Sequence, residues 1–540
     1  MHPTRLSGTD MPLESQANGA HDQTSCSNRI LLVGINAKYI HASFGLRYLY
    51  TNLGELQDQA GIVEFDINQR MVDVAERILS RQPEIIGLGV YIWNVSQIKY
   101  LVQLLKKIRP TLKIVLGGPE VSYETNTQDW LKGVDYVVTG EADVTFYQLC
   151  RNLISESHKE PEVHPKIVHS PTPALSEIQL PYHTYTDDDI KNRIIYVEAS
   201  RGCPFTCEFC LSSLDVPVRA FELESFMEAM KKLFDRGVRH FKFVDRTFNL
   251  NIKTGTTILQ SFLDLYEPGL FLHFEMIPDR LPEALRGLIQ QFPKGSVQFE
   301  IGIQTFNDEV ANNISRRQNL EKTRDNIRFL RQETGVHLHV DLIAGLPGED
   351  FVSFGQGFNQ LIELNPHEIQ IGILKRLRGT PIVRHDQTYN MVYDEEPPYE
   401  IIKNQHLCFE DLQRIKRFAR YWDLVGNSGN FIGTVSLIWS KTQNPFDSFM
   451  AFSDWLYGST GNRHGIALTK LVAYVFHYLT EQINLEPQTV AETLWVDYQR
   501  TGRSDQPICL RPYLESVAQK QKSQAGSKNQ TPKRQRMHQD

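Results

Sequence analysis

Three cysteines that follow a predicted strand constrain this chain more than any other feature. Cys203, Cys207 and Cys210 come directly after the apolar, β-branched run at residues 194–197, in the spacing Cys-x3-Cys-x2-Cys. Iron–sulfur clusters are usually held by four thiolates. A loop with only three leaves one iron open, as a catalytic zinc site keeps one position free for its reactant. The spacing therefore favours an iron–sulfur cluster with one open iron, which a molecule offering an amine and a carboxylate could occupy.

Two other interpretations of these cysteines are a zinc knuckle and three buried thiols without metal. Zinc sites prefer four ligands in paired Cys or His modules. No second pair follows here, because the remaining cysteines are scattered singly: Cys26, Cys150, Cys408 and Cys509. Core cysteines also rarely cluster in a loop beside a glycine and a proline, here Gly202 and Pro204. The pattern favours the cluster.

The loop at residues 199–211 resembles the cluster loop of the radical S-adenosylmethionine (SAM) superfamily. In that superfamily an aromatic residue, here Phe209, precedes the last cysteine. The resemblance implies that Cys203, Cys207 and Cys210 are the metal ligands and the catalytic centre, and that Phe209 contacts SAM. It also implies a [4Fe-4S] cluster that reduces bound SAM and releases a 5′-deoxyadenosyl radical.

Composition places the chain among globular proteins of a reducing compartment. Its 540 residues, with 41% hydrophobic and 22% charged residues, predict about three domains. The net charge of −7 argues against a general nucleic-acid binder. Seven cysteines with three grouped argue against a disulfide scaffold. Neither a signal-peptide pattern nor an apolar run of membrane-spanning length is found, so we expect a cytoplasmic enzyme without a membrane partner.

Three polar segments are predicted to lie outside the folded domains. Residues 1–27 are rich in Ser, Asn, Asp, Gln and Gly and are predicted to be a disordered leader. Residues 158–191 carry many Pro, Ser, Glu and Asp and are predicted to be a linker. Residues 516–540 are predicted to be a disordered basic tail, and we favour a solvated segment over a contact with RNA.

Residues 28–157 alternate short apolar strands with amphipathic helices. Strands are predicted at residues 29–34, 62–66, 85–90, 114–116 and 136–138. Five such repeats predict a flavodoxin-like, Rossmann-like domain with a parallel, doubly wound sheet. Ligands of such sheets bind beyond the carboxyl ends of the strands. Gly117 and Gly118 follow one buried strand, where they let a ligand approach the backbone closely.

Placed directly before the cysteine loop, this domain resembles the cobalamin-binding domain of the B12-dependent radical SAM class. The resemblance implies that Gly117 and Gly118 lie along the nucleotide tail of cobalamin. It implies further cobalamin neighbours at Tyr39, His41, Trp93, Asn94, Ser96 and Glu141. A flavodoxin-like domain without any ligand is the alternative.

The loop after the first strand departs from the pattern of cobalamin mutases and methionine synthases. Those proteins carry Asp-x-His-x-x-Gly there, whereas residues 36–45 have neither the Asp nor the spacing. We therefore expect cobalamin without a lower histidine ligand. His41 is predicted to be a loop or interface residue.

Residues 192–395 repeat strand and helix about six times, which predicts a partial (β/α)6 barrel. Strands are predicted at residues 194–199, 241–245, 270–277, 297–302, 337–344 and 368–374. Buried carboxylates are costly unless they are paired or hydrogen-bonded. We therefore expect a SAM site formed by Asp245, Glu275, Glu300, Gln304 and Asp341, although each acidic residue could instead pair with a neighbouring Arg or Lys. By resemblance, residues 300–304 lie near the SAM ribose, and Ile343 shapes the adenine pocket with residues 345–349.

Residues 396–515 are mostly helical in period and rich in aromatic residues. They predict a helical cap on the barrel whose aromatic side chains form a core. The segment resembles an uncharacterised C-terminal domain found on a subgroup of these enzymes. We expect substrate choice to depend on it.

Together these features predict a cobalamin-dependent radical SAM enzyme that methylates an unactivated carbon of a small-molecule or unknown substrate, with a flavodoxin or ferredoxin as reductant. One alternative is a radical SAM enzyme that uses cobalamin for rearrangement or ring chemistry. A second is a methylthio- or sulfur-inserting enzyme acting on tRNA, which needs a second cluster that the scattered cysteines do not provide. A third is a cobalamin-binding sensor with a vestigial cluster.

Overall fold

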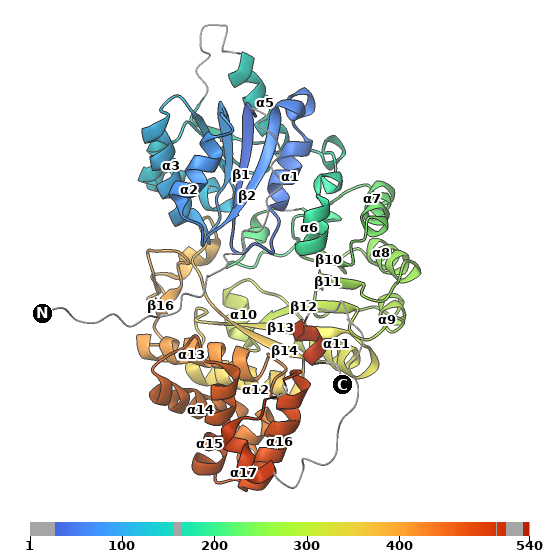
Figure 1. Ribbon diagram of the computed structural model, residues 1–540, viewed down its shortest axis with the longest axis vertical. Coiled ribbons are helices and arrows are strands. Elements are labelled where there is room, and N and C mark those ends of the chain that lie inside the picture. The colour runs from blue at the N-terminus through green and yellow to red at the C-terminus, as the bar shows by residue number, and fades with distance from the viewer. Residues whose placement is uncertain (1–27, 156–164, 216, 504, 515–532, 539–540) are drawn as a thin grey trace, which may run out of the picture.

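The computed structural model describes residues 28–155, 165–215, 217–503, 505–514 and 533–538. An N-terminal α/β domain lies at the top of Figure 1, the barrel beneath it and the helical region at the bottom. Among the described residues no helix combines the length and apolar character that a membrane span requires. The predicted leader and most of the predicted tail lie outside the described residues.

The N-terminal domain is a six-stranded parallel sheet in the order β2-β1-β3-β4-β5-β6. Its strands are β1 (Ile30–Asn36), β2 (Ala60–Asp66), β3 (Ile85–Gly89), β4 (Lys113–Gly117), β5 (Tyr136–Thr139) and β6 (Ile167–His169). All seven residues of β1 are buried, because both faces of the sheet are covered. This confirms the doubly wound fold.

Two hydrophobic cores divide the side chains of β1 between them. Leu31 and Val33 pack with the helices α2 (Met71–Leu79) and α3 (Val95–Ile108). On the other face, Ile30 and Leu32 pack with α1 (Phe44–Thr51) and α5 (Asp143–Ser155). The alternation follows from the two-residue period of a strand.

The predicted linker is partly structured and completes this sheet. Within it, β6 pairs in parallel with β5, and the helix α6 (Asp187–Asn192) precedes the barrel. Thr186 begins α6 with a capping box, in which its side chain accepts from the backbone of Asp189. The sequence analysis missed β6, because a strand of only three residues within a polar segment is too short to show a period.

The second parallel sheet has the order β14-β13-β12-β11-β10-β7, with β7 and β14 at its edges, as in a partial barrel. Its strands are β7 (Ile195–Val197), β10 (His240–Phe243), β11 (Phe271–Glu275), β12 (Val297–Gln304), β13 (His337–Ala344) and β14 (Glu368–Ile373). The helices between them are α7 (Leu223–Asp235), α8 (Ile252–Asp264), α9 (Glu283–Ile289), α10 (Asp308–Asn313), α11 (Leu320–Glu333) and α12 (Phe351–Leu364).

The C-terminal region is helical, as predicted. It comprises α13 (Phe409–Val425), α14 (Pro445–Thr460), α15 (Leu468–His477), α16 (Pro487–Arg500) and α17 (Arg511–Leu514). Phe358 of α12 contacts the rings of Phe418 and Trp422 of α13, with centroids 5.0 and 4.8 Å apart. One hydrophobic core therefore runs without a break from the barrel into this region.

The prediction of a disordered tail is wrong for residues 533–538. Residues Lys533–Met537 form α18, which packs beside the amino ends of the barrel strands (Figure 1). Arg534 pairs with Glu368 at 2.6 Å and with Asp423 at 2.7 Å. Because Glu368 is buried, it needs a positive partner, and no local pattern shows that the partner is 166 positions away.

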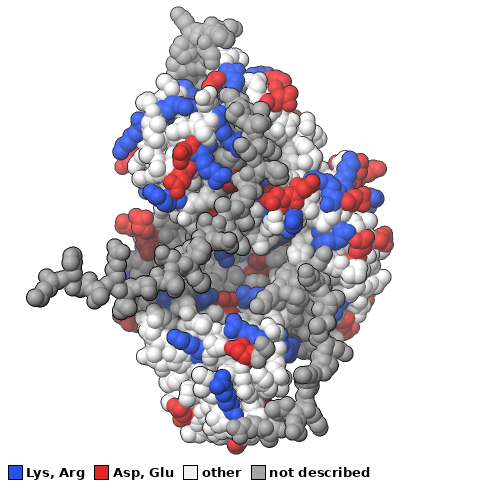
Figure 2. Space-filling view, viewed as in Figure 1, with Lys and Arg blue, Asp and Glu red and all other residues white. Residues whose placement is uncertain are grey.

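Charged side chains of both signs are interspersed on the face that Figure 2 shows. They do not gather there into the basic stripe that is typical of a nucleic-acid-binding surface.

Candidate active site and cofactor sites

The cysteine loop begins after the short strand β8 (Ser200–Arg201). Cys203 and Cys207 are buried, and Cys210 is partly exposed. Gly202 has a φ of +91°, and a Cβ there would meet the carbonyl oxygens of Asp215 and Pro217 at 2.7 and 2.8 Å. Only glycine fits this turn.

The three thiols line one cavity, so they could ligate different irons of a single cluster. Burial raises the pKa of Cys203, so this thiol ionises readily only when a metal replaces its proton.

A cavity of about 170 Å³ lies beside the cysteines, at the carboxyl ends of β11, β12 and β13. The three cysteines line it, together with five of the residues predicted to bind SAM: Phe209, Glu275, Glu300, Gln304 and Asp341. Four strands or loops that are distant in sequence therefore meet at one point. The barrel topology predicts this convergence.

Two carboxyl groups in this cavity have opposite protonation preferences. Burial opposes ionisation of Glu300, but the hydrogen bond from His273 at 2.9 Å lowers the pKa of Glu300 to about 2. Burial and the charge of Glu300 raise the pKa of Asp341 well above its usual value. The two neighbouring carboxyl groups thus differ in how readily they ionise, because Asp341 holds its proton more tightly than Glu300 does.

Two buried polar atoms of the cavity lack a hydrogen bond among the described residues, namely Gln304 Oε1 and Asp341 Oδ1, which has only His339 Nε2 nearby at 3.4 Å. Gln304 also has a φ of +74° where β12 shifts register against β13. Unpaired buried polar atoms and a strained residue are the features of a ligand site. These residues therefore fit a polar ligand such as SAM.

Asp245 and Ile343 do not line this cavity. Asp245 is buried, and its carboxyl group accepts hydrogen bonds from Ala199 N at 3.0 Å and Ser200 Oγ at 2.6 Å. Burial raises its pKa to about 7. The structure thus places Asp245 where it supports the strand that leads into the cysteine loop.

The sequence analysis missed Arg316, which lines the cavity. Its Nη1 lies 3.4 Å from Cys207 Sγ, and its Nε donates to Ile303 O at 3.2 Å. Arg316 follows α10, a six-residue helix without a clear period. The only local signal is the pair of adjacent arginines at positions 316 and 317.

A second cavity, of about 520 Å³, lies at the carboxyl ends of β1 and β3. Its walls are mostly apolar and include His41, Trp93 and, from the barrel side, Tyr196 and Val244. An adjoining cavity of about 210 Å³ runs along β3 to β5 over Gly87, Gly89, Gly117 and Gly118. A row of glycines beside an apolar space fits a large flat ligand with an extended tail, such as cobalamin.

Gly118 is the most constrained residue of this edge. Its φ is +102°, and a Cβ there would lie 2.6 Å from Val90 O. A Cβ on Gly117, in contrast, would meet only Val138 O, at 3.6 Å. Gly118 therefore shapes the turn, while Gly117 leaves space beside it.

The other residues predicted to contact cobalamin do not line either cavity. Asn94 is buried, and its amide donates to Ile35 O at 3.0 Å and to Gly89 O at 3.1 Å. The remaining three are Tyr39, whose hydroxyl donates to Asp188, Ser96, which is exposed, and Glu141, which pairs with Arg201. His41 lies at the domain interface, where its Nδ1 is 2.6 Å from Tyr196 Oη.

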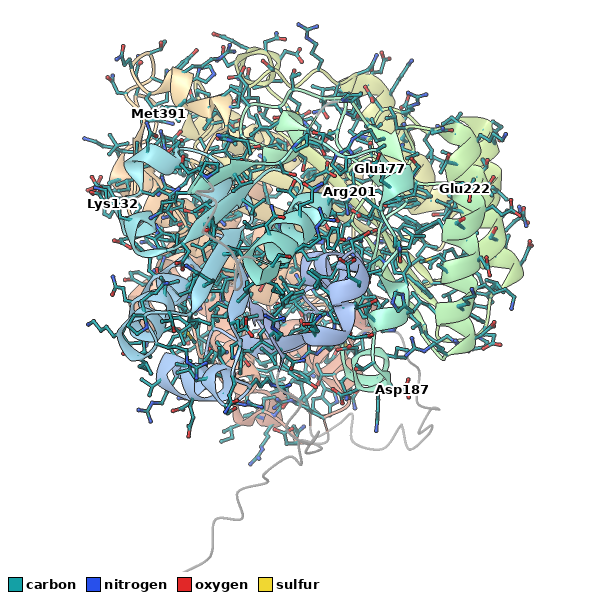
Figure 3. The ribbon with its side chains drawn as sticks, turned by 90° about the horizontal axis from the view of Figure 1, so that it is seen from above. Lys132, Glu177, Asp187, Arg201, Glu222 and Met391 are labelled. Atoms are coloured by element: carbon teal, nitrogen blue, oxygen red, sulfur yellow. The ribbon has the colours of Figure 1, made fainter. Side chains whose placement is uncertain are left out.

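Buried ion pairs join the N-terminal domain to the barrel. Arg201 binds Glu141 at 2.8 Å and Asp143 at 2.9 Å in the N-terminal domain, and Glu198 at 2.9 Å next to β7. Seen from above, Arg201 lies near the middle of the molecule (Figure 3). Arg201, which ends the strand before the cysteine loop, thus ties that loop to the N-terminal domain.

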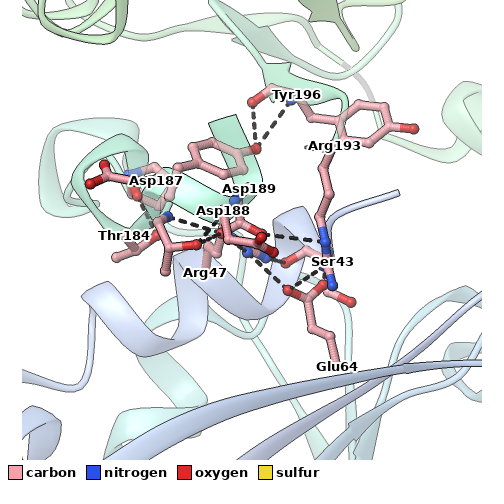
Figure 4. A network of polar contacts seen from close by, with 12 residues as sticks. Ser43, Arg47, Glu64, Thr184, Asp187, Asp188, Asp189, Arg193 and Tyr196 are labelled. Carbon is pink, nitrogen blue, oxygen red and sulfur yellow. Dashed lines mark hydrogen bonds and ion pairs between the residues drawn. The ribbon is translucent and has the colours of Figure 1, made fainter. Parts of the chain in front are cut away.

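A second network of this kind holds α6 (Figure 4). Arg47 pairs with Glu64 and Asp189, each at 2.9 Å, and Arg193 also pairs with Glu64 at 2.9 Å. Burial opposes ionisation of Glu64, but Arg47 lowers its pKa to about 2. Since Arg193 lies two residues before β7, this network helps to set the position of the first barrel strand.

Two family models match the two domains that contain these cavities. The model described as the B12 binding domain matches residues 30–150, and that of the radical SAM superfamily matches residues 197–356. The chain therefore carries a B12-binding domain followed by a radical SAM domain. Its cofactors are accordingly a [4Fe-4S] cluster, SAM and cobalamin. A model described as a protein of unknown function (DUF4080) matches residues 387–539.

Three known proteins show how far the likeness extends. The uncharacterized methyltransferase PH0819 of Pyrococcus horikoshii is 27% identical over 237 residues, which are 40% of this chain and 50% of that protein. The cobalamin-dependent radical SAM methyltransferase TokK of Streptomyces tokunonensis is 23% identical over 393 residues, 65% of this chain and 56% of that protein. The structure of the cobalamin-dependent SAM radical enzyme OxsB with aqua-cobalamin bound is 14% identical, with a TM-score of 0.56 over 91% of this chain and 80% of that chain.

The chain spans about half the length of the curated relatives it matches. Its likeness to OxsB establishes a shared fold. The resemblance inferred from the cysteine loop and the preceding glycines is confirmed.

Proposed function

We propose that this protein is a cobalamin-dependent methyltransferase that cleaves SAM reductively and methylates an unactivated carbon of a small molecule. Two cavities at facing strand ends carry the proposal. The polar cavity contains the cysteines, and the apolar cavity contains the glycine-rich edge of the N-terminal domain. The names of PH0819 and TokK, both methyltransferases, support the reaction class.

The observation that carries the proposed function is that residues of both domains line the apolar cavity. Tyr196 of β7 and Val244, which follows β10, line it together with residues of β1 and β3. A ligand held there by the N-terminal domain faces the interior of the barrel. A carrier of a methyl group and a radical site can then act on one substrate molecule.

When bound, the cluster supplies an electron for cleavage of SAM, and cobalamin supplies a carrier for a methyl group. The protein holds and orients these groups. Cys203, Cys207 and Cys210 ligate the cluster. Glu300 and Asp341 would hold the polar groups of SAM by hydrogen bonds. The apolar walls exclude water from the other cavity.

A small-molecule substrate, a flavodoxin or ferredoxin as reductant and a cytoplasmic location stay predictions. The interspersed charges of Figure 2 offer no support for an RNA substrate. The helical region extends the barrel core, and we propose that it contributes to substrate choice.

The test is anaerobic reconstitution with iron, sulfide and hydroxocobalamin, followed by SAM with a deuterated methyl group. We expect about four irons and one corrin per chain, formation of 5′-deoxyadenosine, and a substrate that gains the labelled methyl group. Cys210→Ala should abolish cleavage, whereas Cys408→Ala, which changes an exposed cysteine outside the loop, should not.

Other outcomes separate the alternatives. A product of unchanged mass would indicate rearrangement chemistry. Bound corrin without any SAM cleavage would indicate a sensor. Zinc in place of iron would overturn the proposal.

A further inference from the structure

A carboxylate lies inside the cysteine loop and is held by a segment beyond the barrel. Glu208, between Cys207 and Cys210, is only 3% exposed. Its Oε2 is 2.9 Å from His385 Nε2, and its Oε1 accepts from Ser315 Oγ at 2.5 Å. Arg384 forms an ion pair with the same carboxylate. A buried carboxylate is tolerated only with such partners.

The backbone of Glu208 is held from the same two sides. Its N–H donates to Ile314 O at 3.0 Å, and its carbonyl accepts from Ile382 N at 3.0 Å. Ile382 belongs to the short helix Pro381–His385, which follows the last barrel strand. Side-chain and backbone contacts thus bind one residue of the cysteine loop to this helix.

The short helix continues directly into the region matched by the model of unknown function, which begins at residue 387. Tyr389 donates its backbone N–H to His385 O at 3.0 Å. Its hydroxyl accepts from Asn313 Nδ2 at 2.9 Å, one residue before Ile314. The start of the C-terminal region therefore holds both segments that contact Glu208.

We infer that His385 is a positioning residue which, through Glu208, fixes the cysteine loop and sets the reduction potential of its cluster. This inference rests on the proposed function, because it requires a [4Fe-4S] cluster at this loop. The potentials of such clusters depend on nearby charge and hydrogen bonds. The negative charge of Glu208 disfavours addition of an electron, and the hydrogen bond from His385 offsets that charge.

The size of the effect follows from proximity. Adjacent residues have Cα atoms about 3.8 Å apart, so the charge of Glu208 lies within roughly 10 Å of the cluster. At an effective dielectric constant of about 20, one such charge changes the ratio of reduced to oxidised cluster about ten-fold. For a one-electron couple, ten-fold corresponds to about 59 mV.

The experiment is a redox titration of the reconstituted full-length protein, followed by electron paramagnetic resonance of the reduced cluster. Glu208→Gln removes the charge and should raise the midpoint potential by about the shift given above. His385→Ala leaves the charge less compensated and should lower the potential. His385→Gln places an N–H donor where Nε2 lies and should restore a potential close to that of the wild type.

His477→Ala is the matched control, because His477 pairs with Glu481 at 2.8 Å on an exposed helix far in sequence from the loop. It should leave the potential unchanged. Loss of iron in His385→Ala that His385→Gln reverses would also support the inference. Equal potentials in Glu208→Gln, His385→Ala and wild type, all with full iron, would overturn it. A wild-type protein that binds no cluster would instead contradict the proposed function.

Discussion

The strand ends of the two parallel sheets face each other across the domain junction, and the cavities at these ends differ in volume and in the polarity of their walls. At the N-terminal edge the cavity is large and apolar, and its floor is backbone and glycine. At the barrel edge the cavity is about a third of that volume, and its lining includes Glu275, Glu300, Asp341 and Arg316. A bulky ligand needs space along a backbone, whereas a small charged ligand needs fixed partners.

The buried charged residues of the N-terminal domain and of the barrel also differ in how they are paired. In the N-terminal domain, the charges of Arg47 and Glu64 are compensated by each other and by neighbours at the junction. In the barrel, Asp341 keeps a buried oxygen without a hydrogen-bond partner among the described residues. Compensated charges hold the junction together, while a buried carboxyl oxygen without a hydrogen bond is available to a ligand.

The largest expected effect is the complete loss of the cluster from a variant that keeps its corrin. Cys203→Ala should remove all cluster iron and all SAM cleavage, because the cluster would lose one of three ligands. Corrin retained per chain should stay at the wild-type level, since none of the apolar lining changes. Metal analysis and the visible spectrum measure both. Concurrent loss of corrin would show that the edges are not independent.

Gly118→Ala should produce the reverse result. The side chain is strained at a φ of +102° and clashes with Val90 O, which costs about 1–3 kcal/mol. We expect corrin affinity to fall at least about ten-fold with cluster iron unchanged. Gly133→Ala is the control in the same domain, because a Cβ there meets no atom within 4 Å. Equal corrin binding by both variants would contradict the role of Gly118.

Buried carboxyl groups in the two regions should respond to pH with opposite sign. The lowered pKa of Glu64, about 2, contributes stability above pH 4.5 that is lost as pH falls through 2. The raised pKa of Asp245, about 7, contributes stability below pH 3.8 that is lost as pH rises through 7. The contribution amounts to about 3 kcal/mol for Glu64 and about 4 kcal/mol for Asp245.

Denaturant unfolding at several pH values checks this. Relative to wild type, Asp245→Asn should gain stability between pH 5 and pH 8, and Glu64→Gln should gain between pH 5 and pH 3. Parallel pH profiles for wild type and Asp245→Asn would show that Asp245 does not titrate in this range.

The smallest effect is expected at His41. Its Nδ1 is engaged by Tyr196, so His41→Phe should cost about one hydrogen bond, roughly 1 kcal/mol of interface stability. Corrin affinity should change less than about five-fold. Electron paramagnetic resonance of the Co(II) form should show no histidine nitrogen in the wild type. A nitrogen splitting that disappears in His41→Phe would make His41 a cobalt ligand after all.

The sequence by itself determined the features that repeat locally. The cysteine spacing predicted the cluster loop, and strand and helix periods predicted both parallel sheets, which the structure contains. It also anticipated the acidic residues of the polar cavity, because carboxylates inside buried strands contradict the surrounding pattern. A doubly wound sheet and a barrel then force the carboxyl ends of their strands together.

Only the tertiary structure decided which polar residues are free for a ligand and which are already paired. Asp245 and Glu141 carry the same carboxylates as Glu300, yet they bind Ser200 and Arg201 instead of lining a cavity. Glu208 and His385 are 177 positions apart, and Arg534 reaches Glu368 from a segment of polar composition. Such pairs leave no local pattern, because a charge in a sequence does not show which distant charge the fold will bring beside it.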